Sequence, residues 1–416
     1  MSRFVVFLLM IIISGSVYGK TAKSTVILLS IDGFSYDYLS QYQPKNILAF
    51  AKSGVKAKLL PVYPSKTFPN HLSIITGVYP ARHGIIHNRF YHPKLGEKYS
   101  LGAGKNDSTW LTAQPFWSFV EENNISSAVY FWPESEATGQ GSLPSFNIPY
   151  NRKDSEKAHF DQIINWLKLP EAQAPQFIAS YFSSVDDAGH KFGANSAQVK
   201  HAVAEIDKIF GHFISRLQKE IPQNVNVILL SDHGMMQIDK KMNINVTAVF
   251  DENLIKLITE KSMVVAQSST QLYVYFDHEK MSVKKQASVF QSLFKKQSVN
   301  ADLYTVYRKG NYPEHWQFHD DLAIIPDLIL EAAANSSFTN DKYPSDNVAT
   351  HGYDAKNQQK LSAIFLAAGP DIIQVQQLDA FENIHIVPLM SQLLGLKQIP
   401  HIDGNASVLA PIIKSH

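Results

Sequence analysis

A threonine at the start of an apolar segment is the first residue of this sequence that is placed to do chemistry. Thr67 comes two residues before Pro69, and residues 72–75 are mostly apolar. Proline is well accommodated in the first turn of a helix, so Pro69 predicts a helix start. Thr67 should then lie just before the helix N-terminus, where backbone N–H groups favour a phosphate or an alkoxide. The competing interpretation is that Thr67 is a plain helix N-cap, and this segment alone favours it.

A second stretch carries an aspartate and a histidine four residues apart. On a helical turn Asp186 and His190 face the same way, so one rigid element could supply two metal ligands. Asp187 is the nearest competitor for the aspartate's role. Alone, this spacing is a weak signal.

Further oxygen and nitrogen donors lie next to apolar runs. Asp32 follows one run, Asp232 and His233 follow another, and His351 precedes a third. Asp232 could equally be a helix cap, and His351 a surface histidine. Taken together, carboxylates and imidazoles form a ligand set that suits Zn²⁺ better than Mn²⁺ or iron.

Composition narrows the class of protein. The chain has 416 residues, of which 45% are hydrophobic and 18% charged, which predicts a sizeable core and excludes a largely disordered chain. A formal net charge of +1 argues against a general polyanion binder, so we expect no stable nucleic-acid complex. The absence of cysteine excludes a thiol nucleophile, a disulfide framework and a cysteine-ligated metal.

Alternating apolar runs and helical patterns predict the fold class. Strands buried on both faces are expected at Thr25–Ile31, 177–184, Val225–Leu230 and 361–368, with helices at 44–52, Phe116–Glu122, 159–167 and 197–219. This order predicts an α/β fold with a doubly wound, mostly parallel sheet and helices on both faces. Ligands of such sheets bind beyond the carboxyl ends of the strands. Since three of the four runs end in acidic or Asp-His groups, metal-binding side chains should gather at one edge.

The segment from about 255 to 345 departs from this pattern. It contains an alternating run at Gln271–Phe276, an exposed helix at 282–296 and a second strand pair around 323–331. We interpret it as an inserted α+β subdomain within a single catalytic domain that spans residues 20–416.

The first 19 residues have the pattern of a signal peptide. Arg3 is followed by an apolar run at 4–13, too short to span a bilayer, and then by small residues. An uncleaved anchor is the alternative. An exported chain without cysteine suits a bacterial periplasm. No other segment is long and apolar enough to span a membrane, and no protein partner is evident.

Eight motifs together resemble the nucleotide pyrophosphatase/phosphodiesterase family of the alkaline phosphatase superfamily. The most specific are Thr-Phe-Pro-Asn-His at 67–71 and Ser-Asp-His-Gly-Met at 231–235. The likeness runs in order from about residue 25 to residue 412, with further matches at 31–33, 76–80, 83–88, 131–133, 186–190 and 351–354.

The resemblance implies an alkaline phosphatase-like fold and two Zn²⁺ sites. It implies that one ion is held by Asp186, His190 and His351, and the other by Asp32, Asp232 and His233 with Thr67 as fourth ligand. Asp186 is preferred to Asp187 because its spacing to His190 matches the family.

The same resemblance implies a course for the reaction. Thr67 would attack phosphorus to give a covalent intermediate that water then hydrolyses, while Asn88 hydrogen-bonds a phosphate oxygen. Phe68 and Tyr181 would line a slot for a nucleotide base, although Tyr181 could equally be a core aromatic. A long polar loop at 133–156 looks more like nucleotide-cleaving members than like a lysophospholipid-cleaving one.

We therefore predict a secreted two-zinc enzyme that hydrolyses nucleotide phosphodiester or pyrophosphate bonds and releases nucleoside monophosphates. A lysophospholipase C/choline phosphodiesterase and a phosphomonoesterase are alternatives, but the monoesterases add a third metal and an arginine, and neither Arg82 nor Arg89 stands at a matching position. A sulfatase is disfavoured because its Cys/Ser-x-Pro-x-Arg motif is absent around Thr67. A binding-only pseudoenzyme is the alternative from another class, yet every ligand type is present.

Overall fold

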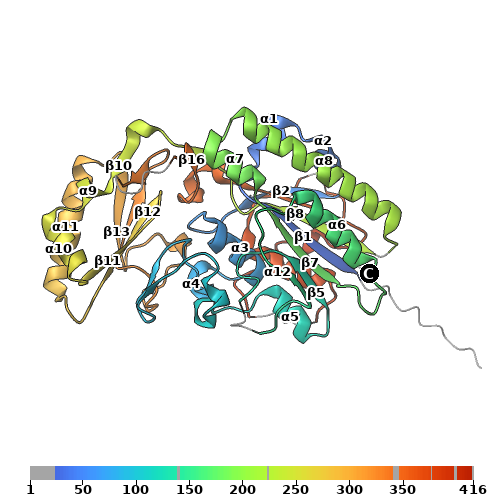
Figure 1. The fold of residues 1–416 in the computed structure, drawn as a ribbon, viewed down its shortest axis with the longest axis horizontal. Coiled ribbons are helices and arrows are strands. Elements are labelled where there is room, and N and C mark those ends of the chain that lie inside the picture. The colour runs from blue at the N-terminus through green and yellow to red at the C-terminus, as the bar shows by residue number, and fades with distance from the viewer. Residues whose placement is uncertain are drawn as a thin grey trace, which may run out of the picture.

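A central eight-stranded sheet organises the chain (Figure 1). The computed structural model describes residues 24–137, 141–222, 224–340, 346–375, 377–397 and 401–414, so the expected signal peptide lies outside it. The strand order is β18-β2-β17-β8-β1-β7-β5-β6. The strands are β1 (Thr25–Ile31), β2 (Val55–Leu60), β5 (Ser127–Tyr130), β6 (Phe146–Ile148), β7 (Phe177–Phe182), β8 (Val225–Leu230), β17 (Ala363–Ala368) and β18 (Phe381–Glu382).

The sheet is mostly parallel, as predicted. Strands β8, β1, β7, β5 and β6 pair in parallel, whereas β17 is antiparallel to both of its neighbours. The apolar run at 361–368 predicted a buried strand correctly but not its direction. Burial on both faces follows from a position between two other strands, whichever way the chain runs.

Helices cover both faces of the sheet, which gives three layers (Figure 1). Side chains of β1 alternate between two hydrophobic cores: Ile27 and Leu29 pack on one face, and Val26 and Leu28 on the other. The first core includes residues of α2 (Lys45–Lys52), α6 (Glu156–Leu167) and α8 (Ala197–Glu220), near which lie α1 (Asp37–Tyr42) and α7 (Ser184–Phe192). The second includes residues of α3 (Thr67–Thr76), α4 (Pro80–His83), α5 (Phe116–Glu122) and α12 (Ile386–Leu393).

The polar loop expected at 133–156 contains a strand. Residues 146–148 form β6, which pairs in parallel with β5 at the edge of the sheet. A three-residue strand with intermediate burial has no long apolar run, so the sequence pattern did not reveal it. Helix α6 begins at Glu156, where the side chain of Ser155 accepts the N–H of Ala158 as an N-cap.

The inserted subdomain holds its own antiparallel sheet, in the order β11-β12-β14-β13. Its strands are β11 (Met263–Gln267), β12 (Gln271–Phe276), β13 (Tyr304–Arg308) and β14 (Leu328–Ala332), accompanied by α9 (Val246–Val249), α10 (Glu252–Thr259) and α11 (Val283–Val299). The strand pair expected around 323–331 is confirmed only in part. One strand, β14, overlaps this range but starts after Pro326, which has no N–H to give to a ladder, and its partner β13 lies earlier in the chain.

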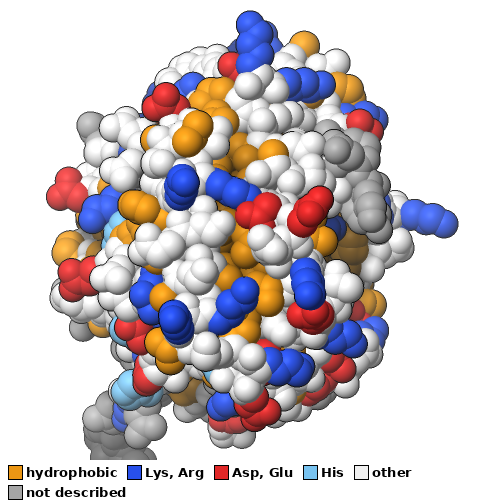
Figure 2. Space-filling view, turned by 90° about the vertical axis from the view of Figure 1, so that its left-hand side faces the viewer, with side chains coloured by type: hydrophobic (Ala, Val, Ile, Leu, Met, Phe, Trp, Pro, Cys, Tyr) orange, Lys and Arg blue, Asp and Glu red, His pale blue; other side chains and the backbone are white. Residues whose placement is uncertain are grey.

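Short strand pairs complete the fold: β3 (Tyr91–His92) with β4 (Glu97–Lys98), β9 (Met236–Gln237) with β16 (Ala349–Thr350), and β10 (Asn243–Asn245) with β15 (Ser337–Thr339). The outer face of the inserted subdomain mixes charges of both signs with scattered apolar side chains (Figure 2). Within the described ranges, no helix is both long and apolar enough to cross a membrane.

Candidate active site

Neighbouring strands of the central sheet deliver their polar side chains to one edge. Asp32 directly follows β1, and Asp232 and His233 follow β8. Asp186 and His190 lie on α7, which begins just after β7. Because β8, β1 and β7 are adjacent and parallel, these residues converge at the carboxyl ends of the strands.

The first group of ligand-type side chains is buried. Asp32, Asp232 and His233 offer atoms that lie within 4.8 Å of one another, and all three residues are buried. Oδ1 of Asp232 accepts the backbone N–H groups of Gly33 (3.2 Å) and His233 (2.9 Å). Nε2 of His233 lies 2.9 Å from Oδ2 of Asp232. We call these three residues the inner group.

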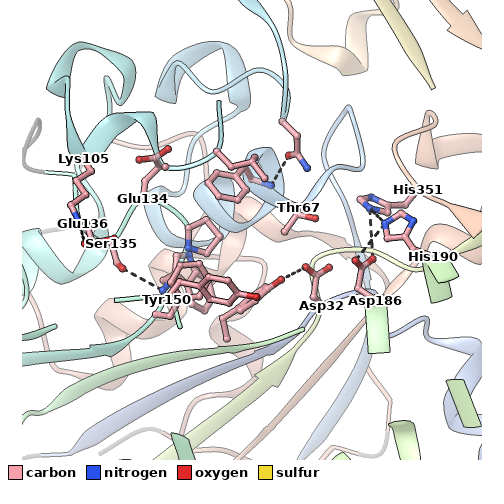
Figure 3. A pocket seen from close by; sticks show the side chains of 18 residues that line it. Asp32, Thr67, Lys105, Glu134, Ser135, Glu136, Tyr150, Asp186, His190 and His351 are labelled. Atoms are coloured by element: carbon pink, nitrogen blue, oxygen red, sulfur yellow. Dashed lines mark hydrogen bonds and ion pairs between the residues drawn. The ribbon is translucent and has the colours of Figure 1, made fainter. Parts of the chain in front are cut away.

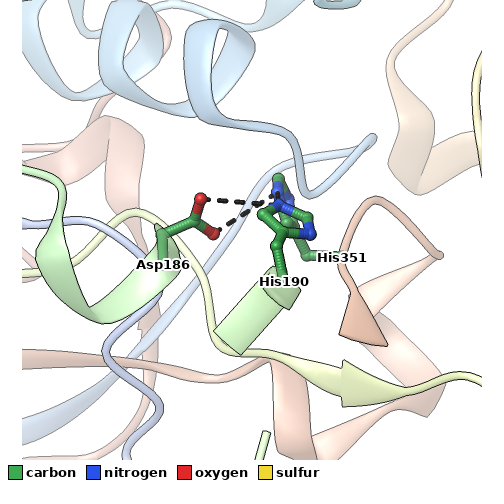
Figure 4. Close-up of side chains that lie close together, drawn as sticks. All are labelled: Asp186, His190 and His351. Atoms are coloured by element: carbon green, nitrogen blue, oxygen red, sulfur yellow. Dashed lines mark hydrogen bonds and ion pairs between the residues drawn. The ribbon is translucent and has the colours of Figure 1, made fainter. Parts of the chain in front are cut away.

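The second group lies beside it, at the edge of a pocket. Asp186, His190 and His351 also offer atoms within 4.8 Å of one another (Figure 4). Nε2 of His190 is 3.4 Å from Oδ2 of Asp186, and Nε2 of His351 is 3.7 Å from Oδ1 of the same carboxylate. Asp187 instead points to the surface, where it accepts from Ser183. We call Asp186, His190 and His351 the outer group.

All three histidines are oriented by the main chain. Nδ1 of His233 lies 2.9 Å from the carbonyl oxygen of Gly234, that of His190 lies 2.9 Å from Ala349, and that of His351 lies 2.8 Å from Ser65. A carbonyl oxygen can only accept, so Nδ1 must carry the proton. Nε2 is therefore the nitrogen of each ring that faces its group and that could bind a metal ion, the arrangement typical of metal-binding histidines.

The two groups fit cations. Among the described residues, Oδ1 of Asp32, Oδ1 of Asp186 and Oδ2 of Asp232 are buried and accept no well-aligned hydrogen bond. Burial, together with the carboxylates of Asp232 and Asp186, raises the pKa of Asp32 well above its usual range. Burial also raises the pKa of Asp186. Three buried carboxylates this close together are costly, and a metal ion in each group would relieve that cost.

Thr67 begins helix α3 and does not cap it. The N-cap position belongs to Lys66, which makes no side-chain capping bond, so the N-cap interpretation of Thr67 is wrong. Its hydroxyl instead lies 3.4 Å from Nε2 of His233, next to the inner group. Pro69 falls in the first turn, as predicted.

Asn88 lines the same pocket. The backbone N–H of Phe68 donates to Oδ1 of Asn88 over 3.0 Å. Because a backbone N–H can only donate, the atom facing it must be the amide oxygen. The NH₂ group of Asn88, which lines the pocket, is therefore the end that can donate to a ligand.

A pocket of about 460 Å³ joins the metal-binding residues to an aromatic region (Figure 3). At one end lie Thr67, Asp32 and the outer group; toward the other lie Tyr150, Lys105 and Glu136. Phe68 and Tyr181 also line the pocket. The hydroxyl of Tyr181 donates to Oδ2 of Asp32 over 2.6 Å, so this tyrosine also holds an inner-group carboxylate.

Several pocket residues were not found from the sequence. Phe131 and Tyr150 lie with ring centroids 4.4 Å apart, and Lys105 pairs with Glu136 at the pocket wall. Phe131 was present in a matched motif but had no assigned role, and it adopts a left-handed backbone with φ of 49°. Tyr150 lies in a polar stretch without periodicity, and ion pairs between distant positions leave no local pattern.

A family model and several known proteins match this chain, and all of them are phosphodiesterases or nucleotide pyrophosphatases by description. The family model for type I phosphodiesterase / nucleotide pyrophosphatase matches residues 26–354. An uncharacterized pyrophosphatase/phosphodiesterase of Schizosaccharomyces pombe is 30% identical over 390 residues, which cover 91% of this chain and 78% of that protein. A venom phosphodiesterase of Naja atra is 32% identical over 94% of this chain, but the match spans only 47% of the venom protein.

Solved structures share the whole fold. Murine ectonucleotide pyrophosphatase / phosphodiesterase 5 superposes with a TM-score of 0.83 and 25% identity, covering 94% of this chain and 100% of that one. An inactive threonine-to-alanine variant of the murine protein, in complex with AMP, superposes equally well. The chain therefore belongs to the type I phosphodiesterase / nucleotide pyrophosphatase family of the alkaline phosphatase superfamily, and it is a hydrolase of that class.

Proposed function

We propose that this chain is an exported two-zinc enzyme that cleaves nucleotide phosphodiester or pyrophosphate bonds and releases a nucleoside monophosphate. The observation that carries the proposal is the pocket itself, which joins a threonine hydroxyl and two Asp/His groups to a wall of aromatic side chains. The AMP complex of the murine relative, at 25% identity, supports the nucleotide part.

The inner and outer groups would each hold one zinc ion. Both consist of carboxylates and imidazoles, with three Asp or His ligands each, which leaves a fourth position in a tetrahedral site that the Thr67 oxygen would take in the inner group. When bound, such ions would lower the pKa of the Thr67 hydroxyl and of a water molecule and would stabilise the charge on the phosphate.

Thr67 and Asn88 would carry the protein's part of the reaction. The Thr67 oxygen attacks phosphorus and forms a new P–O bond, while the bond to the leaving alcohol or phosphate breaks on the opposite side. Water then attacks the covalent intermediate, releases the nucleoside monophosphate and restores the hydroxyl. The NH₂ group of Asn88 donates to a phosphate oxygen and stabilises its charge without adding a full positive charge.

The aromatic end would bind the base. Phe68, Phe131 and Tyr150 offer ring surface, and Tyr150 is 46% exposed, so its ring is accessible from solvent. Stacking on an aromatic side chain contributes about 1–3 kcal/mol per base in nucleic-acid binding proteins. Lys105 and Glu136 supply a donor and an acceptor at this end for the polar edge of the base.

The charge of the pocket favours a diester over a monoester. The described lining contains no arginine: Arg82 is bonded to Asp403, and Arg89 is exposed and lies outside the lining. A monoester dianion carries one more negative charge, which a guanidinium or a third metal would have to balance. A diester also brings a second group whose binding energy can be used at the reacting phosphorus.

The test is a turnover panel with the zinc-loaded enzyme. It compares ATP, a dinucleotide, a p-nitrophenyl nucleotide, lysophosphatidylcholine and p-nitrophenyl phosphate. We expect kcat/KM for the nucleotide diester to exceed that for the monoester at least ~10²-fold, which corresponds to about 2.7 kcal/mol. A preference for the monoester or for lysophosphatidylcholine would replace the proposal with one of those activities.

Three variants test whether the aromatic side chains of the pocket bind the base. Phe68→Ala and Tyr150→Ala should reduce turnover of a nucleotide diester much more than that of a small, base-free diester. Equal losses on both substrates would assign these rings to packing. Tyr181→Phe keeps the ring but removes the hydroxyl that holds Asp32, so it should slow both substrates alike.

A further inference from the structure

The loop that carries His351 is held from two sides by buried polar groups. It consists of residues 351–354, directly after β16. On one side, Nδ1 of His351 donates to the carbonyl of Ser65, and the N–H of Gly352 donates to the Ser65 hydroxyl over 3.0 Å. The ammonium group of Lys66 donates to the carbonyl of His351. Ser65 and Lys66 belong to the central domain and immediately precede Thr67.

Side chains of the inserted sheet form hydrogen bonds with the other side of the loop. Gln271 on β12 and Glu331 on β14 are directly opposite each other in the antiparallel ladder, and both are buried. The side-chain amide of Gln271 donates to the carbonyl of Gly352 over 2.6 Å. Oε1 of Glu331 accepts the N–H of Asp354 over 3.2 Å. Two backbone groups of the loop are thus fixed by side chains of the subdomain.

These two side chains are themselves fully constrained. The amide of Gln271 also donates to Oε2 of Glu331 over 2.9 Å, and the hydroxyl of Tyr63 donates to the same oxygen over 2.7 Å. Oε1 of Gln271 accepts the hydroxyl of Thr270 over 2.6 Å. Every polar atom of the pair therefore has a partner, and a satisfied buried network of this kind is rigid.

The fit around the loop is tight. Gly352 has φ of +116°, a backbone conformation that favours glycine. A Cβ added there would collide with the side chain of Lys66 on one side and that of Thr270 on the other. The loop therefore has no room to shift between the central domain and the inserted sheet.

We propose that Gln271 and Glu331 are positioning residues for the outer metal site, so that the inserted sheet sets the place of His351 and with it the affinity of the outer group for its ion. The proposal rests on the two-metal function proposed above. The inner group makes no described hydrogen bond to the inserted sheet: its side chains bond to Gly33, Gly234, Tyr181 and Thr67. It touches the His351 loop through ring stacking of His233 on His351, with centroids 3.5 Å apart. Loss of a partner that orients a ligand typically lowers metal affinity by 10- to 100-fold.

The experiment measures metal binding by the full-length protein without reference to turnover. Zinc is bound to the parent, to Gln271→Ala and to Glu331→Ala, and a chelator titration gives the number of ions and the affinity of each. We expect the affinity for one ion to fall 10- to 100-fold in both variants, while that for the other stays within 2-fold of the parent. Val274→Ala is the matched control, because Val274 is buried on the same strand but faces the subdomain's own hydrophobic core.

A double variant separates positioning from general loss of stability. If Gln271 acts through His351, adding Gln271→Ala to His351→Ala should change the remaining affinity by less than 2-fold. Tyr63→Phe, which removes one donor to Glu331 and keeps the ring, should give a smaller loss at the same ion and serves if a larger change prevents folding.

Three results would overturn the inference: both ions bound as tightly as in the parent, both weakened equally, or an equal effect of Val274→Ala. A parent chain that binds no zinc would instead refute the two-zinc function on which the inference rests.

Discussion

The inner and outer groups use similar ligands but are assembled in different ways. Asp32, Asp232 and His233 directly follow two adjacent strands of the central sheet, and their side chains are at most 2% exposed. The outer group takes Asp186 and His190 from helix α7, with side chains 14% and 23% exposed, and His351 from a loop. The chain between His190 and His351 includes β8 and the whole inserted subdomain.

The difference separates two ways of building a metal site. The geometry of the inner group follows from the register of β1 and β8, which the hydrophobic core already fixes. The geometry of the outer group also depends on the inserted subdomain, which separates β8 from the loop that carries His351. We therefore expect changes in the core to affect both groups, and changes in the inserted sheet to affect only the outer one.

The largest expected effect comes from Thr67, which lies beside the inner group. Thr67→Ala should lower turnover at least ~10³-fold because it removes the nucleophile. Both metal ions should remain, since each group keeps its three Asp and His residues. Thr67→Ser should retain measurable activity. Single-turnover kinetics and metal analysis check this, and full activity of Thr67→Ala would refute the assignment of the nucleophile.

Removal of single ligands should distinguish the two groups directly. His351→Ala should reduce the bound zinc from two ions to one and lower Tm moderately, because His351 is buried and its ring makes one main-chain hydrogen bond, to the carbonyl of Ser65. Asp232→Ala should also lose one ion and lower Tm further, because Asp232 is fully buried and its removal leaves the backbone N–H groups of Gly33 and His233 without their acceptor. Metal analysis and thermal unfolding give both readouts. Equal changes in Tm would contradict the distinction.

A variant at Asn88 tests whether turnover can fall while both groups keep their metal ions. Asn88→Ala should lower kcat by about 10²–10³-fold, the usual cost of one lost donor to a developing negative charge. Both ions should stay bound, since Asn88 contacts the phosphate and its oxygen is bonded to Phe68. A loss of zinc in this variant would show that Asn88 supports a metal site.

The smallest expected effect concerns the pH dependence of stability in the inserted sheet. Burial raises the pKa of the Glu331 carboxyl to about 8, although the Tyr63 hydroxyl and the Gln271 amide oppose the shift and the charge of Asp354 adds to it. In the unfolded chain the pKa of this group would be about 4.3. The folded state therefore retains a proton that the unfolded state releases, and the stability from this group falls as pH rises from about 4.3 to about 8.

Glu331→Gln does not titrate and isolates this contribution. The free energy of unfolding of the parent minus that of the variant should decrease between pH 5 and pH 8, by an amount on the order of a few kcal/mol. Urea unfolding of both proteins at matched pH and saturating zinc measures the difference. A difference that is constant or increases with pH would contradict the raised pKa.

The sequence predicted the central sheet, which carries the inner group, better than the inserted subdomain, on which the outer group depends. The bounds of β1 and β8 were predicted to the residue, because buried parallel strands are continuous apolar runs, and the acidic residues after them were placed at the correct edge. One strand of the inserted pair was misplaced and the direction of β17 was not foreseen. Both depend on contacts between distant segments, which leave no local periodicity.

The pocket wall was the hardest part to predict. Phe68 was found because it adjoins Thr67 in a recognisable motif, whereas Tyr150 and the ion pair of Lys105 with Glu136 come from stretches without a pattern. The contacts of Gln271 and Glu331 with the His351 loop join residues more than twenty positions apart, and a glutamine on a strand does not by itself indicate a partner.

The carbonyl groups that orient His190, His233 and His351 have a consequence for sequence drift. A side chain at such a position could be lost by a single mutation, but a backbone carbonyl is present whatever residue stands there. Ser65 and Ala349 could change identity and still accept the Nδ1 proton, provided the chain keeps its path. The orientation of these three imidazoles thus depends on the path of the main chain. It should be kept when many of the surrounding side chains are substituted.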